Sequence, residues 1–175
     1  MIIIKEGEVK VSLKQENKVL VPGSTVLVMA NDEYKIENVD NAGTTYYVFL
    51  YKSKAPPDVE RGIATGGSFI TDWNDLEFHP HDKGGLWQYF SRPTSMTKRF
   101  DIHVTSLNAG IKSHEPHTHR AAEIVLIIKG NTEMYIDNRF YKGTSGDLYF
   151  LGSNVLHAIQ NIGAEPSMYF AIQWE

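Results

Sequence analysis

Short apolar runs separated by turn residues constrain this chain more than any other feature of its sequence. The runs are rich in β-branched and aromatic residues, and turn residues bound them: Val9–Leu13, Val26–Met29, Tyr46–Tyr51, Ile102–Val104, Ile124–Ile128, Met134–Ile136, Leu148–Leu151 and Met168–Ile172. Such runs are typical of antiparallel strands in a sandwich or barrel. No segment keeps a 3.6-residue period long enough to predict a helix. The sequence therefore predicts an all-β fold.

The composition narrows the class of protein. Apolar residues make up 42% and charged residues 22% of the 175 residues, which is typical of a soluble globular protein with a core. The net charge of −4 gives no reason to expect nucleic acid or a membrane as a partner. No apolar run approaches transmembrane length, and Met1–Lys5 is too short for a signal peptide, so the localisation stays open.

The first part of the chain resembles the last part when it is shifted by 123 positions, without a gap from residue 7 to residue 52. Identical residues then coincide at six places: Gly7 with Gly130, Gly23 with Gly146, Asn31 with Asn154, Ile36 with Ile159, Asn38 with Asn161 and Tyr46 with Tyr169. Two β-meanders that merely share a spacing of turns are the alternative. Because the matches include turn glycines, we favour a duplication.

A region of different composition separates the two similar parts. Lys52–Asp58 contains adjacent prolines, which cannot join a central strand, and is interpreted as a linker. Residues 60–100 are rich in Gly with interspersed aromatic residues, and we expect them to form an extended arm. The expected division is a first unit at 1–55, a linker and arm at 56–100 and a second unit at 101–175.

Histidine is concentrated where a site would be expected. All seven histidines lie at or after residue 79, and four fall between residues 103 and 119. In an extended chain, residues two apart point to the same face, so His117 and His119 project together and Glu123 shares their parity. His157 begins a later strand, which in a barrel of hairpins can return beside the first.

Three imidazoles and one carboxylate suit a divalent transition metal: Mn, Fe, Co, Ni or Zn. Cysteine is absent, so thiolate ligands are excluded. Four protein ligands on an octahedral ion leave two positions for water, oxygen or a chelating substrate. A closed structural zinc site would instead be tetrahedral.

The two histidine-bearing segments resemble the two motifs of the cupin family. The first motif has a Gly, a His-X-His, a Glu and a further Gly, matched by Gly110, His117, His119, Glu123 and Gly130 with one extra residue before His117. The second motif is matched at the family's spacing by Gly146, His157 and Asn161. Gly152 stands where the family usually has Pro, and Asn154 where it usually has Gly; both suit a tight turn.

The resemblance implies a jelly-roll barrel, also called a double-stranded β-helix, over about residues 98–175, and a partial cupin unit over 1–52. It also implies that His117, His119, Glu123 and His157 bind one metal ion. Tyr34 occupies the place of His157 in the first unit, and the place of the first motif would precede residue 1. We therefore expect a bicupin whose first unit is truncated and metal-free. Open sheet edges in such a unit predict a homodimer formed by strand sharing.

Other residues are candidates for supporting roles. His114 is an alternative ligand, expected on a solvent-facing loop, and His103 is expected in the core or behind the ligands. Either Glu115 or His103 is a candidate proton carrier. Trp87, Tyr149, Tyr169 and Gln173 line either a pocket or the core. His79-Pro-His81 resembles a ligand pair without a partner Glu and is interpreted as a loop.

Two classes of function remain open. The first is a metal-dependent enzyme of the dioxygenase, isomerase or hydrolase type that acts on a small oxygenated molecule. Ureidoglycine aminohydrolases are one alternative within this class, although the Gln that their motif carries is missing at His157. The second class is a non-catalytic cupin that binds or senses a small ligand. Fold alone does not decide between the two.

Overall fold

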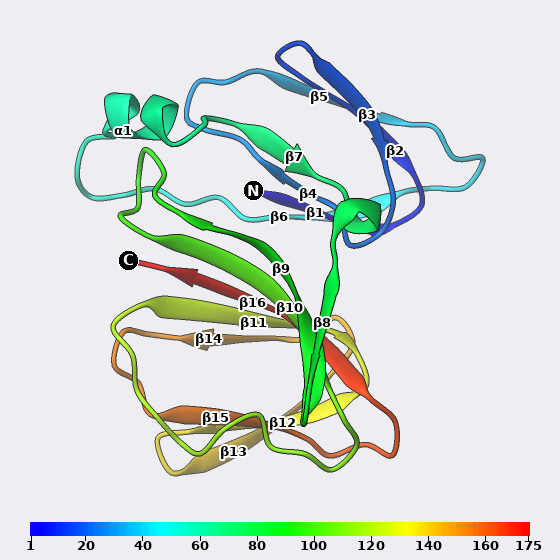
Figure 1. Cartoon of the computed structure of the whole chain (residues 1–175), viewed down its shortest axis with the longest axis vertical. Coiled ribbons are helices and arrows are strands. Elements are labelled where there is room, and N and C mark those ends of the chain that lie inside the picture. The colour runs from blue at the N-terminus through cyan, green and yellow to red at the C-terminus, as the bar shows by residue number, and fades with distance from the viewer. The chain divides into compact units, whose positions relative to one another are not determined.

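The computed structural model describes all residues 1–175 and confirms the all-β prediction (Figure 1). Two short helices are present, α1 (Val59–Ala64) and the 3-10 helix η1 (Trp73–Asp75). The strands are β1 (Ile2–Glu6), β2 (Val9–Leu13), β3 (Glu16–Leu20), β4 (Thr25–Leu27), β5 (Tyr34–Asn38), β6 (Thr45–Val48), β7 (Phe69–Thr71), β8 (Phe78–His81), β9 (Gly84–Arg92), β10 (Phe100–Leu107), β11 (Ala122–Lys129), β12 (Asn131–Ile136), β13 (Arg139–Thr144), β14 (Leu148–Leu151), β15 (His157–Asn161) and β16 (Ser167–Trp174). No helix is long and apolar enough to span a membrane.

The chain divides into two compact units. The first comprises residues 1–76 with 93–97, and the second comprises residues 77–92 with 98–175. The boundary therefore falls inside the segment expected to form an arm. Its β7 joins a sheet of the first unit, whereas β8 and β9 join a sheet of the second. The His79-Pro-His81 segment, interpreted as a loop from the sequence, belongs to β8.

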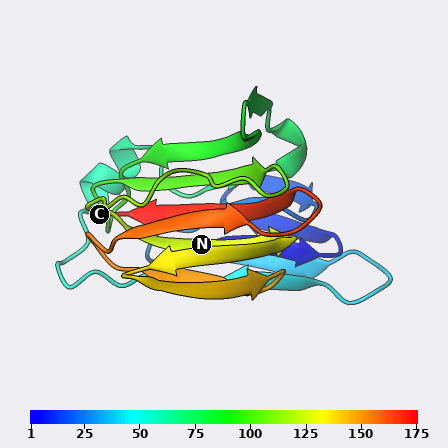
Figure 2. The same cartoon turned by 90° about the horizontal axis from the view of Figure 1, so that it is seen from below.

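The second unit is a sandwich of two antiparallel sheets, as a jelly-roll fold requires. One sheet has the order β14-β11-β16-β10-β9-β8 and the other the order β13-β12-β15. Figure 2 shows the three yellow-to-orange strands of the smaller sheet side by side. The core lies between the sheets, because Met134 and Ile159 of the smaller sheet pack against Val125, Leu151 and Tyr169 of the larger one.

The pleat of the larger sheet decides which side chains face the interior. On β11, Glu123 shares the parity of the buried core residues Val125 and Ile127, so its carboxylate also points inward. On β16, Gln173 likewise follows Tyr169 and Ala171 on the inner face. The inner face is therefore apolar at one end and polar at the other, and the polar end forms the site.

The first unit has a core of its own between two smaller sheets, β6-β1-β4-β7 and β3-β2-β5. Val9, Val11 and Leu13 of β2 are buried and pack against Ile2 and Ile4 of β1. Alternation along β2 places its polar residues on the other face, which explains why its sequence alternates strictly.

The strand pairing of the first unit recurs in the second after the same shift of 123 positions. The pair Ile2–Val26 corresponds to Val125–Tyr149, and both β1 and β11 have a register shift at the equivalent place in the ladders with β6 and β16. Left-handed residues recur as well: Gly7 and Gly130, Lys14 and Asp137, Gly23 and Gly146, Asn31 and Asn154. The repeat inferred from the sequence therefore extends to pairing and turns.

Candidate metal centre

Backbone pairing brings together segments that lie far apart in the sequence. His117 and His119 lie in the loop between β10 and β11, and His157 is the first residue of β15. The amide of each of His117 and His157 donates to the carbonyl of the other, at 3.1 and 3.0 Å. The amide of Asn154 donates to the carbonyl of His119 at 2.8 Å. Asn154 has a left-handed backbone (φ 60°), as expected for the tight turn before His157.

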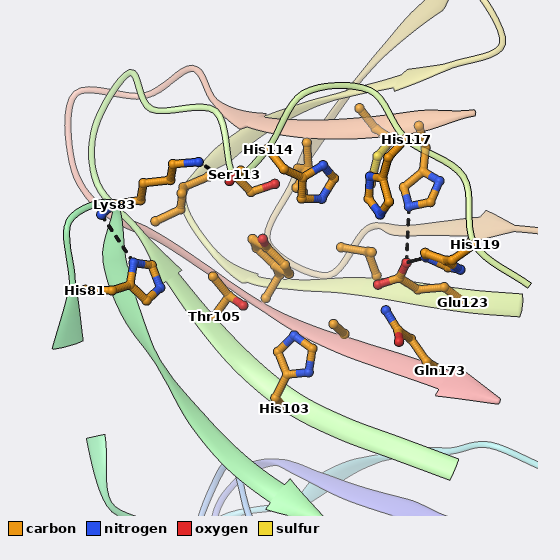
Figure 3. A pocket seen from close by; sticks show the side chains of 17 residues that line it. His81, Lys83, His103, Thr105, Ser113, His114, His117, His119, Glu123 and Gln173 are labelled. Carbon is orange, nitrogen blue, oxygen red and sulfur yellow. Dashed lines mark hydrogen bonds and ion pairs between the residues drawn. The ribbon is translucent and has the colours of Figure 1, made fainter. Parts of the chain in front are cut away.

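The structure brings His117, His119 and His157 into one group, and Figure 3 shows Glu123 beside His119. One nitrogen from each of His117, His119 and His157 lies within 4.8 Å of the others. Glu123 Oε2 lies 3.2 Å from His119 Nε2 and 3.4 Å from His157 Nε2. Glu123 and His157 are buried, so the cluster is anchored in the barrel wall.

Hydrogen bonds fix the tautomers of two of these histidines. His119 Nδ1 lies 2.8 Å from the carbonyl of Ala121, and His157 Nδ1 lies 2.8 Å from the carbonyl of Val155. A carbonyl only accepts, so Nδ1 carries the proton in both rings and Nε2 is left facing Glu123. Two neutral rings would direct their lone pairs at a carboxylate oxygen, an arrangement that a proton or a shared cation stabilises. The donor set therefore fits a divalent metal ion, with a carbonyl behind each of these imidazoles.

The electrostatics favour an ionised carboxylate. Burial raises the pKa of Glu123, but hydrogen bonds from His157 and Gln173 outweigh burial and hold this pKa below its usual value. Burial lowers the pKa of His157, but its hydrogen bonds with Glu123 and with the carbonyl of Val155 outweigh burial, so the net shift of this pKa is upward. Burial lowers the pKa of His117, which favours the neutral ring that binds metals.

A cavity of about 270 Å³ opens beside the cluster. Its wall is formed by seventeen residues of the second unit: His81, Lys83, His103, Thr105, Leu107, Ser113, His114, His117, His119, Glu123, Val125, Met134, His157, Ile159, Tyr169, Ala171 and Gln173. Of the supporting residues expected from the sequence, His103, His114, Tyr169 and Gln173 line this cavity. The other two do not: Trp87 packs on Phe78, and Tyr149 lies in the core with its hydroxyl near Thr132.

His114 lies on the loop between β10 and β11, as expected from the sequence, but it does not face solvent. It is half-buried in the cavity wall, and its ring centroid is 4.0 Å from that of His117 in an edge-on arrangement. Burial is the main cause of its lowered pKa. Glu115, one of the two candidate proton carriers, is exposed and pairs with Lys112 outside the cavity.

His103 lies in the cavity wall opposite the metal loop (Figure 3). Its Nδ1 is 3.3 Å from Oδ1 of Asp101, which is buried and two residues earlier on the same face of β10. Burial raises the pKa of Asp101, but hydrogen bonds from His103 and Ser91 and the charge of Arg99 outweigh it, so the net pKa is lowered. An ionised Asp101 therefore orients the imidazole.

The sequence did not identify His81 and Lys83 as parts of the site. His81 is the last residue of β8, Lys83 lies in the turn between β8 and β9, and both line the cavity. Their spacing of two residues was visible, but no local pattern indicates that this hairpin extends the barrel sheet.

Comparison with known proteins gives a consistent result. The family model described as "Cupin domain" matches residues 103–173. The structure is similar to AerE from Microcystis aeruginosa (TM-score 0.70, 17% identity, 99% of this chain and 76% of that one). It is also similar to Ylba from E. coli, with a TM-score of 0.70 and 16% identity over 98% of this chain and 66% of that one. A third similar structure is oxalate decarboxylase from Lactobacillus farciminis, with a TM-score of 0.72 and 16% identity over 98% of this chain and 69% of that one. The chain thus spans two thirds to three quarters of these proteins. No curated protein sequence matches it.

Proposed function

Because this chain belongs to the cupin superfamily, with a cupin domain at residues 103–173, we propose that it is a metal-dependent enzyme acting on a small oxygenated molecule. In this proposal His117, His119, Glu123 and His157 hold one divalent transition metal. The observation that carries the proposal is the position of two Nε2 atoms around one carboxylate oxygen, with both Nδ1 atoms bound to carbonyls.

A network behind Glu123 supports the orientation of this carboxylate. Gln173 lies opposite Glu123 in the ladder between β11 and β16 and hydrogen-bonds to it. The Oε1 atom of Gln173 accepts from Arg99 Nη2 at 3.5 Å, and the same Arg99 nitrogen is 3.6 Å from Asp101. Such partners restrict the rotation of a ligand and keep this carboxylate ionised.

The metal, when bound, would act as a Lewis acid on an oxygen of the substrate. His103 would act as the general base that takes a proton from the substrate. Because its Nδ1–H donates to Asp101, its Nε2 is the nitrogen available to a molecule in the cavity. His103 Nε2 therefore accepts a proton from the substrate, and Asp101 stabilises the resulting imidazolium.

The size of the cavity limits the substrate. Its volume of about 270 Å³ lies below the roughly 300–1,000 Å³ that is usual for drug-sized ligands. The hydroxyl groups of Thr105, Ser113 and Tyr169 in its wall can donate to ligand oxygens. A small oxygenated molecule fits both features.

Elemental analysis of natively purified protein, together with His119→Ala, tests the metal site. We expect one transition metal per chain in the wild type and its loss in the variant. Metal that is absent, or that His119→Ala leaves unchanged, would contradict the proposal.

Turnover by the metal-loaded protein, followed by oxygen uptake and product analysis with diketones, flavonols and hydroxy acids, tests the enzyme. We expect His103→Gln to keep the metal and to lower turnover by roughly 10²–10⁴-fold, the usual contribution of a general base. Glu115→Gln is the control and should keep full turnover. A metal-loaded protein without turnover would favour the alternative of a non-catalytic ligand-binding cupin.

A further inference from the structure

Lys83 is a half-buried lysine in the cavity wall without an acidic partner. Its Nζ donates to the carbonyl of Ser113 at 2.7 Å, and it forms no ion pair with any carboxylate of the chain. An ammonium group has three donors, so the carbonyl leaves two for a ligand. A charge that is partly removed from water without a counter-ion favours the binding of an anion.

His81 adds a second donor next to Lys83. The backbone amide of Lys83 donates to His81 Nδ1 at 3.2 Å, so this nitrogen is unprotonated and the neutral ring carries its proton on Nε2. His81 lines the cavity as well. The turn between β8 and β9 thus presents an ammonium group and an imidazole N–H.

The two charged ends of the cavity are separate. Figure 3 shows Lys83 and His81 on one side of the cavity and His119 and Glu123 on the other, with His103 between them. Glu123 is the single carboxylate in the wall, and it belongs to the predicted ligand set. With a divalent cation bound, the wall would carry more positive than negative charge, with a positive group at each end.

We propose that the cavity takes a small dicarboxylic acid, with one carboxylate at the metal centre and the other bound by Lys83 and His81. This inference rests on the proposed function and specifies its class of substrate. It also places the carbon chain between the two carboxylates beside His103 Nε2, where a proton would be transferred. The β8–β9 hairpin then selects the substrate, since it supplies both groups at that end.

Binding of acids of increasing length to Mn²⁺-loaded protein tests this proposal. Isothermal titration calorimetry would compare the dicarboxylates from oxalate to adipate with the monocarboxylates butyrate and valerate. We expect an optimum at a dicarboxylate longer than oxalate, bound roughly 10- to 100-fold more tightly than a monocarboxylate of equal length, the usual gain from a charged hydrogen bond.

Lys83→Met should remove that preference and leave monocarboxylate binding unchanged, because it keeps an apolar stem and loses the charge. Lys83→Arg should keep the preference because it keeps the charge, and retained monocarboxylate binding shows that Lys83→Met is folded. Lys112→Met is the control, since Lys112 pairs with exposed Glu115 and does not line the cavity.

Three outcomes would overturn the dicarboxylate proposal: no acid binds to the Mn²⁺-loaded protein, mono- and dicarboxylates bind equally, or Lys83→Met weakens both kinds alike. Failure of the protein to bind Mn²⁺ in elemental analysis would instead overturn the proposed function. The two failures are therefore distinguishable in the same sample.

Discussion

In the first unit Tyr34 begins β5, and 123 positions later His157 begins β15. The two strands pair with their neighbours in the same register: Leu13 lies opposite Tyr34, as Ile136 lies opposite His157. Yet Tyr34 is 48% exposed, whereas His157 is 4% exposed and faces Glu123. The strand framework alone therefore does not create the site.

The second unit differs from the first in what is added to the shared strands. Its β10 pairs with β16, and the loop from residue 108 to residue 121 carries two predicted ligands. In the first unit β6, the counterpart of β16, forms the edge of its sheet. The comparison shows that an additional strand and its loop convert a repeated scaffold into a candidate metal centre.

Replacing the equivalent residues His157 and Tyr34 by alanine is the strongest test of this comparison. We expect His157→Ala to reduce bound metal from about one ion per chain to nearly none, a larger loss than the roughly 10–100-fold of a supporting residue. Tyr34→Ala should leave the metal content unchanged. EDTA should lower the melting temperature of the wild type and of Tyr34→Ala, but not that of His157→Ala. Equal metal loss in both variants would place the ion elsewhere.

Replacing the equivalent residues Asn38 and Asn161 should have a smaller effect, on the stability of the fold. Each accepts from the amide two residues later and donates to the carbonyl four residues later. Asn161 is buried and donates also to the carbonyls of Leu107 and Asn108, which anchors the start of the metal loop. We expect Asn161→Ala to cost about 3 kcal/mol of unfolding free energy and Asn38→Ala about 1 kcal/mol. Urea unfolding measures both, and equal costs would contradict this role of Asn161.

A substitution on the edge strand β6 should have the smallest effect, on the affinity of the predicted homodimer. Val48 is 60% exposed on this edge strand, and a charge there opposes strand pairing between two chains. We expect Val48→Lys to weaken a dimer about tenfold, or about 1.4 kcal/mol, in light scattering after size exclusion. Ile63→Lys, at an exposed position on α1, is the control. A wild-type protein that stays monomeric at high concentration would refute the dimer.

The sequence by itself determined the fold class and the repeat. Period-two alternation, as in Val9–Leu13, specifies which face of a strand is buried, and turn residues at Gly23 and Gly146 mark equivalent corners. Both are local properties, so they can be recognised without knowledge of distant contacts. The motif spacing around His117, His119 and Glu123 also predicted a cluster, which the structure brings together with His157.

Only the tertiary structure decided which other residues share the cavity. His81 and Lys83 line the cavity because β9 pairs with β10. His103 lies on the same face of β10 as Asp101, two residues earlier, and contacts its carboxylate. Trp87 has the same kind of sequence context but packs on Phe78 instead. These differences depend on contacts between strands far apart in the chain, and local patterns do not encode them.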